Sequence, residues 1–305
     1  MRNLPSWVLV TPVHDEGELL EELASTIRAQ ELRPRRWVIV DDDSRDDTAA
    51  LLERLAARDR WIDVIRLQRR GTTGAARYAE VLAQGFRAAI ELAEAEGERI
   101  DFVANIDADV RPPPQLFAEL VHRCAGDRTV GIASCRLGIV HDDGSFAPQL
   151  DHPCGAPRSG LRLWRRECLD QAAFYPTPHW GSVTGLRARN RGWRAVVYDD
   201  LRAELVRGDG SRRGWWDGWR RIGEGAWFVG AHPLSIAMQA VVVSAKERDL
   251  KGVALLAGYL ESALRRRRRS NDPELLEFYG DALPRRQLSA AVAKLARPLH
   301  RRGGP

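Results

Sequence analysis

Four short, mostly apolar runs divide the first third of the chain, and they constrain its fold more than any other feature. They are Trp7–Val10, Trp37–Val40, Val64–Leu67 and Phe102–Ile106. Each run has the length of a buried strand, and each is followed by a segment whose apolar residues recur at helical spacing. Buried strands that alternate with one-sided helices indicate a mostly parallel sheet with helices on both faces. We therefore expect an α/β fold.

Polar clusters follow three of these four runs. They are Thr11 to Glu16, Asp41 to Ser44, and Asp107 to Asp109. In open α/β sheets, ligands bind beyond the carboxyl ends of the strands. The three clusters are thus expected to meet at one edge of the sheet and to form a binding site there.

The triplet Asp107-Ala108-Asp109 predicts a divalent metal site. Two carboxylates at a strand end offer the hard oxygen ligands that suit Mg²⁺ or Mn²⁺, and such an ion also binds a diphosphate. The ion would neutralise charge on a leaving nucleoside diphosphate. A solvated turn is the alternative, but the preceding strand and the prolines Pro112–Pro114 favour the metal site.

The run Asp41-Asp42-Asp43 also ends a strand, and its carboxylates are suited to accept hydrogen bonds from a ribose or a base edge. The alternative is that acids cap the following helix. Capping requires only Asp46 or Asp47, and it leaves the three earlier carboxylates unexplained.

Taken together, these segments resemble the family 2 glycosyltransferases with the GT-A fold. The resemblance is carried by Thr11–Glu16, by Val40–Ser44 with Asp47-Thr48, and by Asp107–Asp109, and it covers about residues 5–205. It implies a Rossmann-like GT-A catalytic domain over residues 1–210. Residues 211–305 would form a helical, basic, membrane-associated C-terminal region.

The resemblance also implies roles for individual residues. The nucleotide-sugar pocket would be lined by Pro12, Val13, Glu16, Asp41, Asp42, Arg77 and Asp107. Asp42 would bind the base or ribose, with Asp41 supporting it. Asp107 would bind ribose or metal, and Asp109 would ligate Mn²⁺ or Mg²⁺ directly.

The chain departs from the family pattern at several positions. Asp15 stands where Asn is usual, and Asp43 stands where Gly is usual. Related proteins usually have an acid, the expected catalytic base, where this chain has Gly181. An inverting transfer to a hydroxyl needs a base, so His179 becomes the candidate. The family often supplies a histidine to the metal near residue 205, and here Leu205 stands there.

The basic residues gather in the C-terminal part. From Lys246 onward there are 14 Lys or Arg and 7 Asp or Glu, a net charge of +7, so this part accounts for the net charge of +5 of the whole chain. Gly225–Ala245 is uncharged apart from His232, and we expect a helix lying in or against a membrane interface. The apolar stretch Val253–Leu264 leads into Arg265–Arg269, which suits an anionic cytoplasmic leaflet. A solvated arginine-rich end is the alternative.

The remaining features bear on location. The cysteines have no CxxC spacing, which predicts reduced thiols rather than a zinc site or disulfides: Cys124, Cys135, Cys154 and Cys168. The segment Met1–Trp7 contains no apolar run long enough for a signal peptide. We expect a cytoplasmic protein, peripheral on the inner face of the cell membrane.

Three tryptophans lie close together in the C-terminal part: Trp215, Trp216 and Trp219. They would stack on a sugar, anchor at an interface or pack in a core.

Three functions are compatible with these features. The first is a metal-dependent inverting glycosyltransferase that moves a sugar from a nucleotide-sugar donor to a lipid-linked or polysaccharide acceptor. The second is a nucleotide-sugar-binding protein that has lost catalysis, which Gly181 favours. The third is a nucleotidyltransferase, although the acidic segment His14–Glu18 would repel a triphosphate. Nucleic-acid binding explains the arginines but not the carboxylates, so we expect no nucleic-acid partner.

Overall fold

The structure is a computed structural model. It describes residues 5–69, 74–149, 157–174, 176–177, 179–207 and 214–285. The chain forms two compact units, Met1–Gly208 and Asp209–Pro305. Cys154, Tyr175 and residues 286–305 of the basic tail lie outside the described residues.

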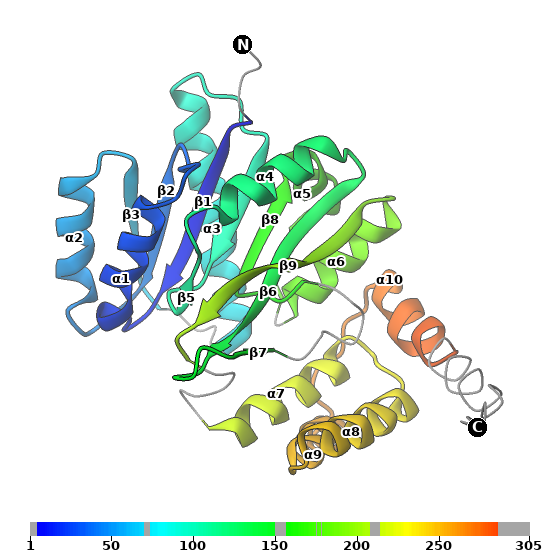
Figure 1. Cartoon of the computed structure of the whole chain (residues 1–305). Helices are drawn as coiled ribbons and strands as arrows, with labels where there is room; N and C mark the ends of the chain where they lie inside the picture. The colour runs from blue at the N-terminus through cyan, green and yellow to red at the C-terminus, as the bar shows by residue number, and fades with distance from the viewer. Residues whose placement is uncertain are drawn as a thin grey trace, which may run out of the picture. The chain divides into compact units, whose positions relative to one another are not determined.

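The first unit is built on one sheet with the strand order β3-β2-β1-β4-β8-β6-β9-β5, and β7 pairs with β6 (Figure 1). The four strands expected from the sequence run parallel to one another: β1 (Trp7–Val13), β2 (Trp37–Asp42), β3 (Ile62–Leu67) and β4 (Phe102–Ile106). The other strands are β5 (Val110–Arg111), β6 (Val130–Val140), β7 (Phe146–Pro148), β8 (Leu161–Arg165) and β9 (Arg194–Leu205). The α/β fold expected from the sequence is confirmed.

Helices cover both faces of this sheet. One face carries α1 (Gly17–Arg28), α2 (Thr48–Arg58) and α4 (Leu116–Gly126). The other carries α3 (Gly74–Ala95), α5 (Arg166–Ala172) and α6 (Trp180–Asn190). Because neighbouring strand residues point to opposite faces, Leu9 of β1 enters the first core and Val10 the second.

The segment between β7 and α6 is rich in proline and glycine, yet it contains a strand and a helix. Strand β8 lies within it and pairs antiparallel with β4 and β6, and α5 follows directly. The strand is hard to recognise because Arg162 interrupts an otherwise apolar run, and a buried arginine is rare. Strand β8 matters for function because it carries Arg162 to the sheet edge that holds the acidic motifs.

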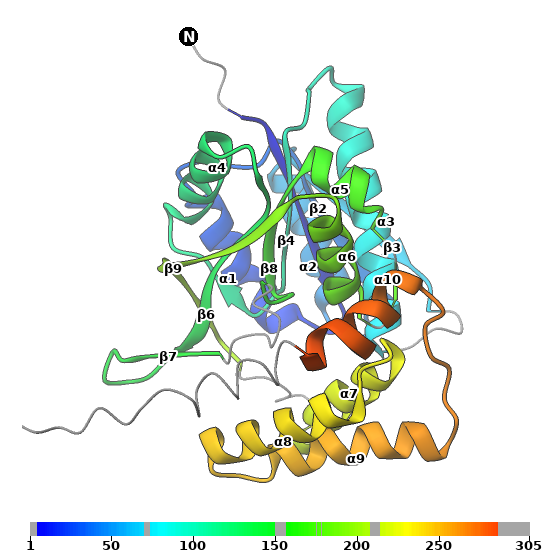
Figure 2. The same cartoon turned by 90° about the vertical axis from the view of Figure 1, so that its right-hand side faces the viewer.

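The second unit consists of helices. They are α7 (Trp215–Phe228), α8 (Pro233–Glu247), α9 (Lys251–Leu264), the short α10 (Pro273–Leu275) and the π-helix η1 (Leu276–Ala282). Helix α9 packs against both α7 and α8 (Figure 2). A Cβ at Gly223 would lie 1.9 Å from the carbonyl oxygen of Leu255, and one at Gly258 would lie 1.8 Å from that of Arg220. Glycine at both positions is what allows the backbones of α7 and α9 to approach so closely.

The uncharged stretch Gly225–Ala245 is not one helix, so that expectation was wrong. Helix α7 ends at Phe228, and Gly230 adopts a left-handed φ of 78°. Helix α8 then starts at Pro233, where His232 Nδ1 accepts a hydrogen bond from the amide of Leu234 at 3.2 Å. Proline at the first helical position favours such a start. Within the described residues, no helix is both long and apolar enough to span a bilayer.

Candidate active site

Hydrogen bonds join the loops that follow β1 and β2 at the carboxyl edge of the sheet. The amide of Asp15 donates to Ser44 Oγ at 3.0 Å, and the amide of Glu16 donates to Thr48 Oγ1 at 2.9 Å. In return, the amide of Arg45 donates to Asp15 Oδ1 at 2.7 Å. The two polar clusters after β1 and β2 therefore form one continuous surface.

The two departures from the family pattern in these loops share a backbone conformation. Asp15 has a φ of 53° and Asp43 a φ of 63°, both in the left-handed region. Asparagine and glycine adopt this region most easily, and aspartate tolerates it better than most residues. The substitutions at Asp15 and Asp43 thus preserve the turns and change only the charge.

Asp42 and Arg77, both assigned to the donor pocket from the sequence, form an ion pair. Arg77 Nε donates to Asp42 Oδ1 at 2.8 Å, and Arg69 Nε donates to Oδ2 at 3.0 Å. Asp42 and Arg77 are only 5% and 7% exposed, whereas the Arg69 side chain is 40% exposed. A ligand that binds Asp42 would have to share this carboxylate with Arg69. Beside it, the Asp41 carboxylate accepts a hydrogen bond from the amide of Ser44 at 3.0 Å.

The other residues assigned to the pocket on β1 differ in exposure. Val13 is 2% exposed and belongs to the hydrophobic core, so only its backbone is available to a ligand. Pro12 is half-buried. Glu16 forms an ion pair with Arg207, which follows the end of β9.

The metal motif lies immediately after β4. The amide of Asp107 donates to the carbonyl of Gly160 at 2.8 Å, and its carboxylate accepts a hydrogen bond from the hydroxyl of Tyr78. Burial, together with the charge of Asp109, raises the pKa of Asp107 from 3.8 to about 8. Two neighbouring carboxylates with too little positive charge around them are suited to a divalent cation.

The ligand set of such a cation would be incomplete without substrate. Among the described residues, no group of three or more histidine, cysteine, aspartate or glutamate side chains converges on a common point. Mg²⁺ is often held by one or two carboxylates plus substrate phosphates and water. Asp107 and Asp109 fit that pattern, and the diphosphate of a donor would complete it.

Strand β9 borders the metal motif at the position where the family often supplies a histidine. Leu205 pairs with Val110, and the amide of Val206 donates to the carbonyl of Asp109 at 2.9 Å. Two residues further along, the side chain of Arg207 forms an ion pair with Glu16. The position thus offers no metal ligand from the side chain of Leu205, and the nearby Arg207 neutralises Glu16 instead.

Arg162 is a site residue that the sequence-based analysis missed. It is 3% exposed, and its guanidinium lies 5.0 Å from the ring centroid of Trp180. Gly181 lies against it, because a Cβ at that position would be 2.8 Å from both terminal nitrogens of Arg162. The available signal was an arginine inside the apolar run Leu161–Trp164. Arginine is rarely buried unless its charge interacts with a partner, so its position in a buried strand indicates a specific role.

His179 occupies the N-cap position of α6 and is half-buried. Burial lowers the pKa of its imidazole from 6.5 to about 4. The ring is therefore neutral at pH 7 and holds a proton only weakly. A general base works best when its pKa lies near the working pH. The imidazole of His179 is therefore too weakly basic to be an efficient catalytic base.

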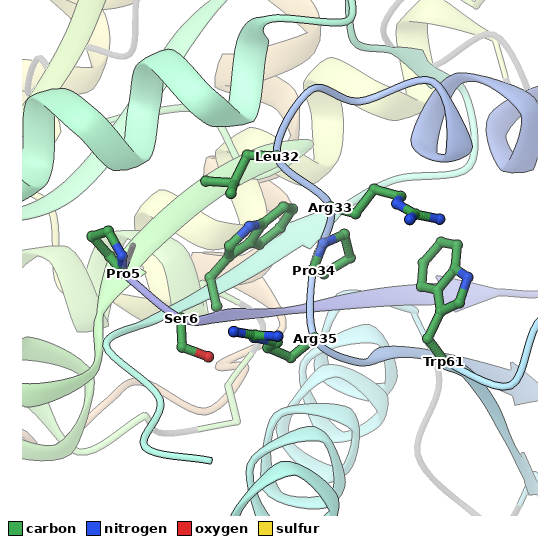
Figure 3. A pocket seen from close by; sticks show the side chains of 8 residues that line it. Pro5, Ser6, Leu32, Arg33, Pro34, Arg35 and Trp61 are labelled. Carbon is green, nitrogen blue, oxygen red and sulfur yellow. The ribbon is translucent and has the colours of Figure 1, made fainter. Parts of the chain in front are cut away.

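A cavity of about 400 Å³ lies at the opposite edge of the sheet (Figure 3). Its walls come from the amino end of β1 and from the loops that precede β2 and β3, and they include Trp7, Arg33, Arg35 and Trp61. The acidic motifs are at the carboxyl ends of the same strands. This cavity is therefore separate from the candidate active site.

Comparison with known proteins identifies the family. The family described as Glycosyl transferase family 2 matches residues 8–192, which is more than half of the chain. The chain belongs to glycosyl transferase family 2. It is a glycosyltransferase, as the acidic motifs at the carboxyl edge of the sheet led us to expect.

Curated relatives share only part of their length with this glycosyltransferase. The undecaprenyl-phosphate 4-deoxy-4-formamido-L-arabinose transferase of Pseudomonas aeruginosa LESB58 is 37% identical over 122 residues, which is 38% of this chain and 32% of the relative. The protein of the same name from Pseudomonas fluorescens SBW25 is 35% identical over 120 residues, 38% of this chain and 31% of the relative. The match thus spans about a third of each relative.

Solved structures show the same fold. The mannosyltransferase PcManGT of Pyrobaculum calidifontis, in complex with GDP-Man and Mn²⁺, aligns with a TM-score of 0.54 and 17% identity over 97% of this chain and 82% of its own. S. aureus TarS 1–349, in complex with UDP-GlcNAc, aligns with a TM-score of 0.52 and 16% identity over 72% of this chain and 65% of its own. At such identities the likeness shows the GT-A fold alone.

Proposed function

We propose that this glycosyltransferase transfers a sugar from a nucleotide-sugar donor to a lipid-linked acceptor, with inversion and with the help of Mn²⁺ or Mg²⁺. The observation that carries the proposal is the meeting of the β1, β2 and β4 loops at one edge, where Asp107 has its pKa raised to about 8 beside Asp109. The names of the Pseudomonas relatives, which act on undecaprenyl phosphate, support a lipid acceptor.

In this proposal the described residues hold the donor. Asp42 binds the ribose or base in competition with Arg69, and Asp41 keeps the turn at Ser44 in place. Asp107 and Asp109 hold the divalent ion, which stabilises the charge on the leaving diphosphate when it is bound. The Tyr78 hydroxyl orients Asp107 through its hydrogen bond.

A second candidate is a nucleotide-sugar-binding protein with lost catalysis. Gly181 favours it, because this residue has no side chain with which to accept a proton from a hydroxyl. His179 is the candidate replacement, and its pKa of about 4 makes it a weak one. Transfer of labelled sugar from donor to a membrane extract separates the two candidates.

We also propose that the second unit binds an anionic membrane surface. Its helices α8 and α9 expose a set of apolar side chains: Val241, Val242, Val253, Leu260 and Leu264. At the end of α9, Arg265 and Arg267 form ion pairs with Glu261. Arg266 and Arg268 make no such pair with any described residue, so their charges are available to lipid phosphates. Each such charge contributes about 1 kcal/mol near an anionic surface.

Vesicle sedimentation tests the membrane proposal. Arg266→Ser together with Arg268→Ser removes about 2 kcal/mol of attraction, so binding to phosphatidylserine-containing vesicles is expected to fall by about 30-fold. Binding to phosphatidylcholine vesicles, which carry no net charge, serves as the control. Equal binding of wild type and double variant to anionic vesicles would contradict the proposal.

The donor site is tested by calorimetric titration of UDP, GDP and dTDP, and of their common sugar conjugates. Wild type is compared with Asp109→Ala, each with and without Mn²⁺. We expect one nucleotide to bind in a metal-dependent manner and the variant to lose that binding. If no nucleotide binds under any metal condition, the donor-site assignment is wrong.

A further inference from the structure

A buried arginine fills the space beside the residue that replaces the family's usual acid. A Cβ at Gly181 would lie 2.8 Å from Nη1 and from Nη2 of Arg162, well inside van der Waals contact. A carboxylate at position 181 would therefore collide with the guanidinium, and it would also neutralise it. The structure thus has a positive charge where relatives usually have a negative one.

The guanidinium of Arg162 is fixed in this place. Its Nε donates to the carbonyl of Arg158 at 3.0 Å, its Nη1 to that of Gly181 at 3.2 Å, and its Nη2 to that of Pro157. Its plane lies over the ring of Trp180. These bonds use three of the five N–H groups of an arginine, so each terminal nitrogen keeps one further hydrogen to donate.

The positive charge of Arg162 has no carboxylate within ion-pair distance among the described residues, although the side chain is 3% exposed. The carboxyl group of Asp107 interacts electrostatically with the Arg162 guanidinium from beyond that distance. A buried charge without a direct partner costs several kcal/mol. Two planar N–H donors on a guanidinium match the oxygens of a phosphate, which would provide the missing counter-charge.

We propose that Arg162, given room by Gly181, binds the phosphate of the acceptor, and that the attacking atom is an oxygen of that phosphate rather than a hydroxyl. This inference rests on the proposed function, since it names the acceptor chemistry of the same site. A phosphate monoester has a second pKa of about 6, so its oxygens are already ionised at neutral pH. Such an acceptor needs no catalytic base, and this accounts for glycine at position 181.

The transfer balances without a proton acceptor. A phosphate oxygen of the acceptor forms a bond to the anomeric carbon of the donor sugar. The bond from that carbon to the nucleoside diphosphate breaks, and its electron pair leaves with the diphosphate. A phosphate dianion becomes a phosphodiester monoanion, and the leaving nucleoside diphosphate gains the negative charge. The weak base His179 is not required for any of these changes.

The linkage of the product tests the proposal with wild-type protein. Labelled sugar is transferred to a membrane extract, and the lipid product is treated with mild acid, which cleaves glycosyl phosphates and leaves alkyl glycosides intact. We expect release of the label. Undecaprenyl phosphate and undecaprenol, compared in the same detergent, should differ by more than 100-fold in rate. An acid-stable product, or equal rates, would overturn this inference alone, whereas no transfer to any component would overturn the proposed function as well.

Glycine variants on one helix test the role of Arg162. Gly181→Ala pushes the guanidinium away, and we expect at least a tenfold higher KM for undecaprenyl phosphate with unchanged affinity for nucleoside diphosphate. Gly181→Asp should be worse, because its carboxylate also neutralises Arg162. The matched control is Gly185→Ala on α6, where an added Cβ meets no atom within 4 Å. If the loss appears instead in nucleotide affinity, Arg162 serves the donor diphosphate and the proposal is wrong.

Discussion

Removal of the Arg77 guanidinium should lower the stability of the first unit more than the loss of an exposed ion pair does. Arg77 Nη2 lies 2.7 Å from Asp42 Oδ1, and both side chains are almost fully buried. Two unit charges about 4 Å apart attract by about 4 kcal/mol at an effective dielectric constant of about 20. Breaking a buried pair costs about 3–5 kcal/mol, because one charge is left without compensation. Since Arg69 still binds Asp42, we expect about 3 kcal/mol for Arg77→Met.

Urea unfolding of four proteins measures this coupling: wild type, Arg77→Met, Asp42→Asn and the double variant. The double variant should recover most of the lost stability, since neither charge then remains buried alone. Glu53→Gln, which breaks the exposed pair with Arg66 at 2.8 Å, should change stability by less than about 0.5 kcal/mol. A loss below about 1 kcal/mol for Arg77→Met, or a double variant no more stable than the single one, would refute the reasoning.

Three further changes have defined outcomes. Tyr78→Phe removes a hydrogen bond to the Asp107 carboxylate, worth about 1.5–3 kcal/mol, so titration should show at least tenfold weaker nucleotide binding in Mn²⁺. Gly258→Ala forces α7 away from α9, and thermal unfolding should show a loss of about 2 kcal/mol despite the better helix propensity of alanine. Burial raises the pKa of Cys135 to about 12, so iodoacetamide at pH 8 should leave it unmodified until the protein unfolds, as mass spectrometry of its peptide would show.

The strands β1 to β4 were predictable because each of them contains a short, mostly apolar run. In β2, Trp37 to Val40 are all fully buried, and a run of that length without polar residues leaves few alternatives to a strand. The acidic edge was predictable for a related reason. Because the strands are parallel, Asp41 and Asp107 both lie at the carboxyl ends of their strands, at the same edge of the sheet.

The remainder of the site depends on contacts that no local pattern encodes. Arg162 lies inside a short apolar run, but that run does not reveal its neighbours, and the pairing of β8 with β4 places it beside the acidic motifs. Tyr78 belongs to helix α3, and its hydrogen bond to Asp107 crosses 29 positions of sequence. The break before α8 was missed because hydropathy averages over Gly230 and Pro233, whereas the backbone responds to each of them separately.

The contact between Gly181 and Arg162 has a consequence for how acceptor preference changes during evolution or design. An acid introduced at position 181 meets the guanidinium at once, and removal of Arg162 alone leaves a site with neither a cation nor a base. If Arg162 binds the acceptor as proposed, each single substitution lowers activity before the second can compensate. On this proposal, a change of acceptor from a phosphate to a hydroxyl requires simultaneous substitutions at positions 162 and 181.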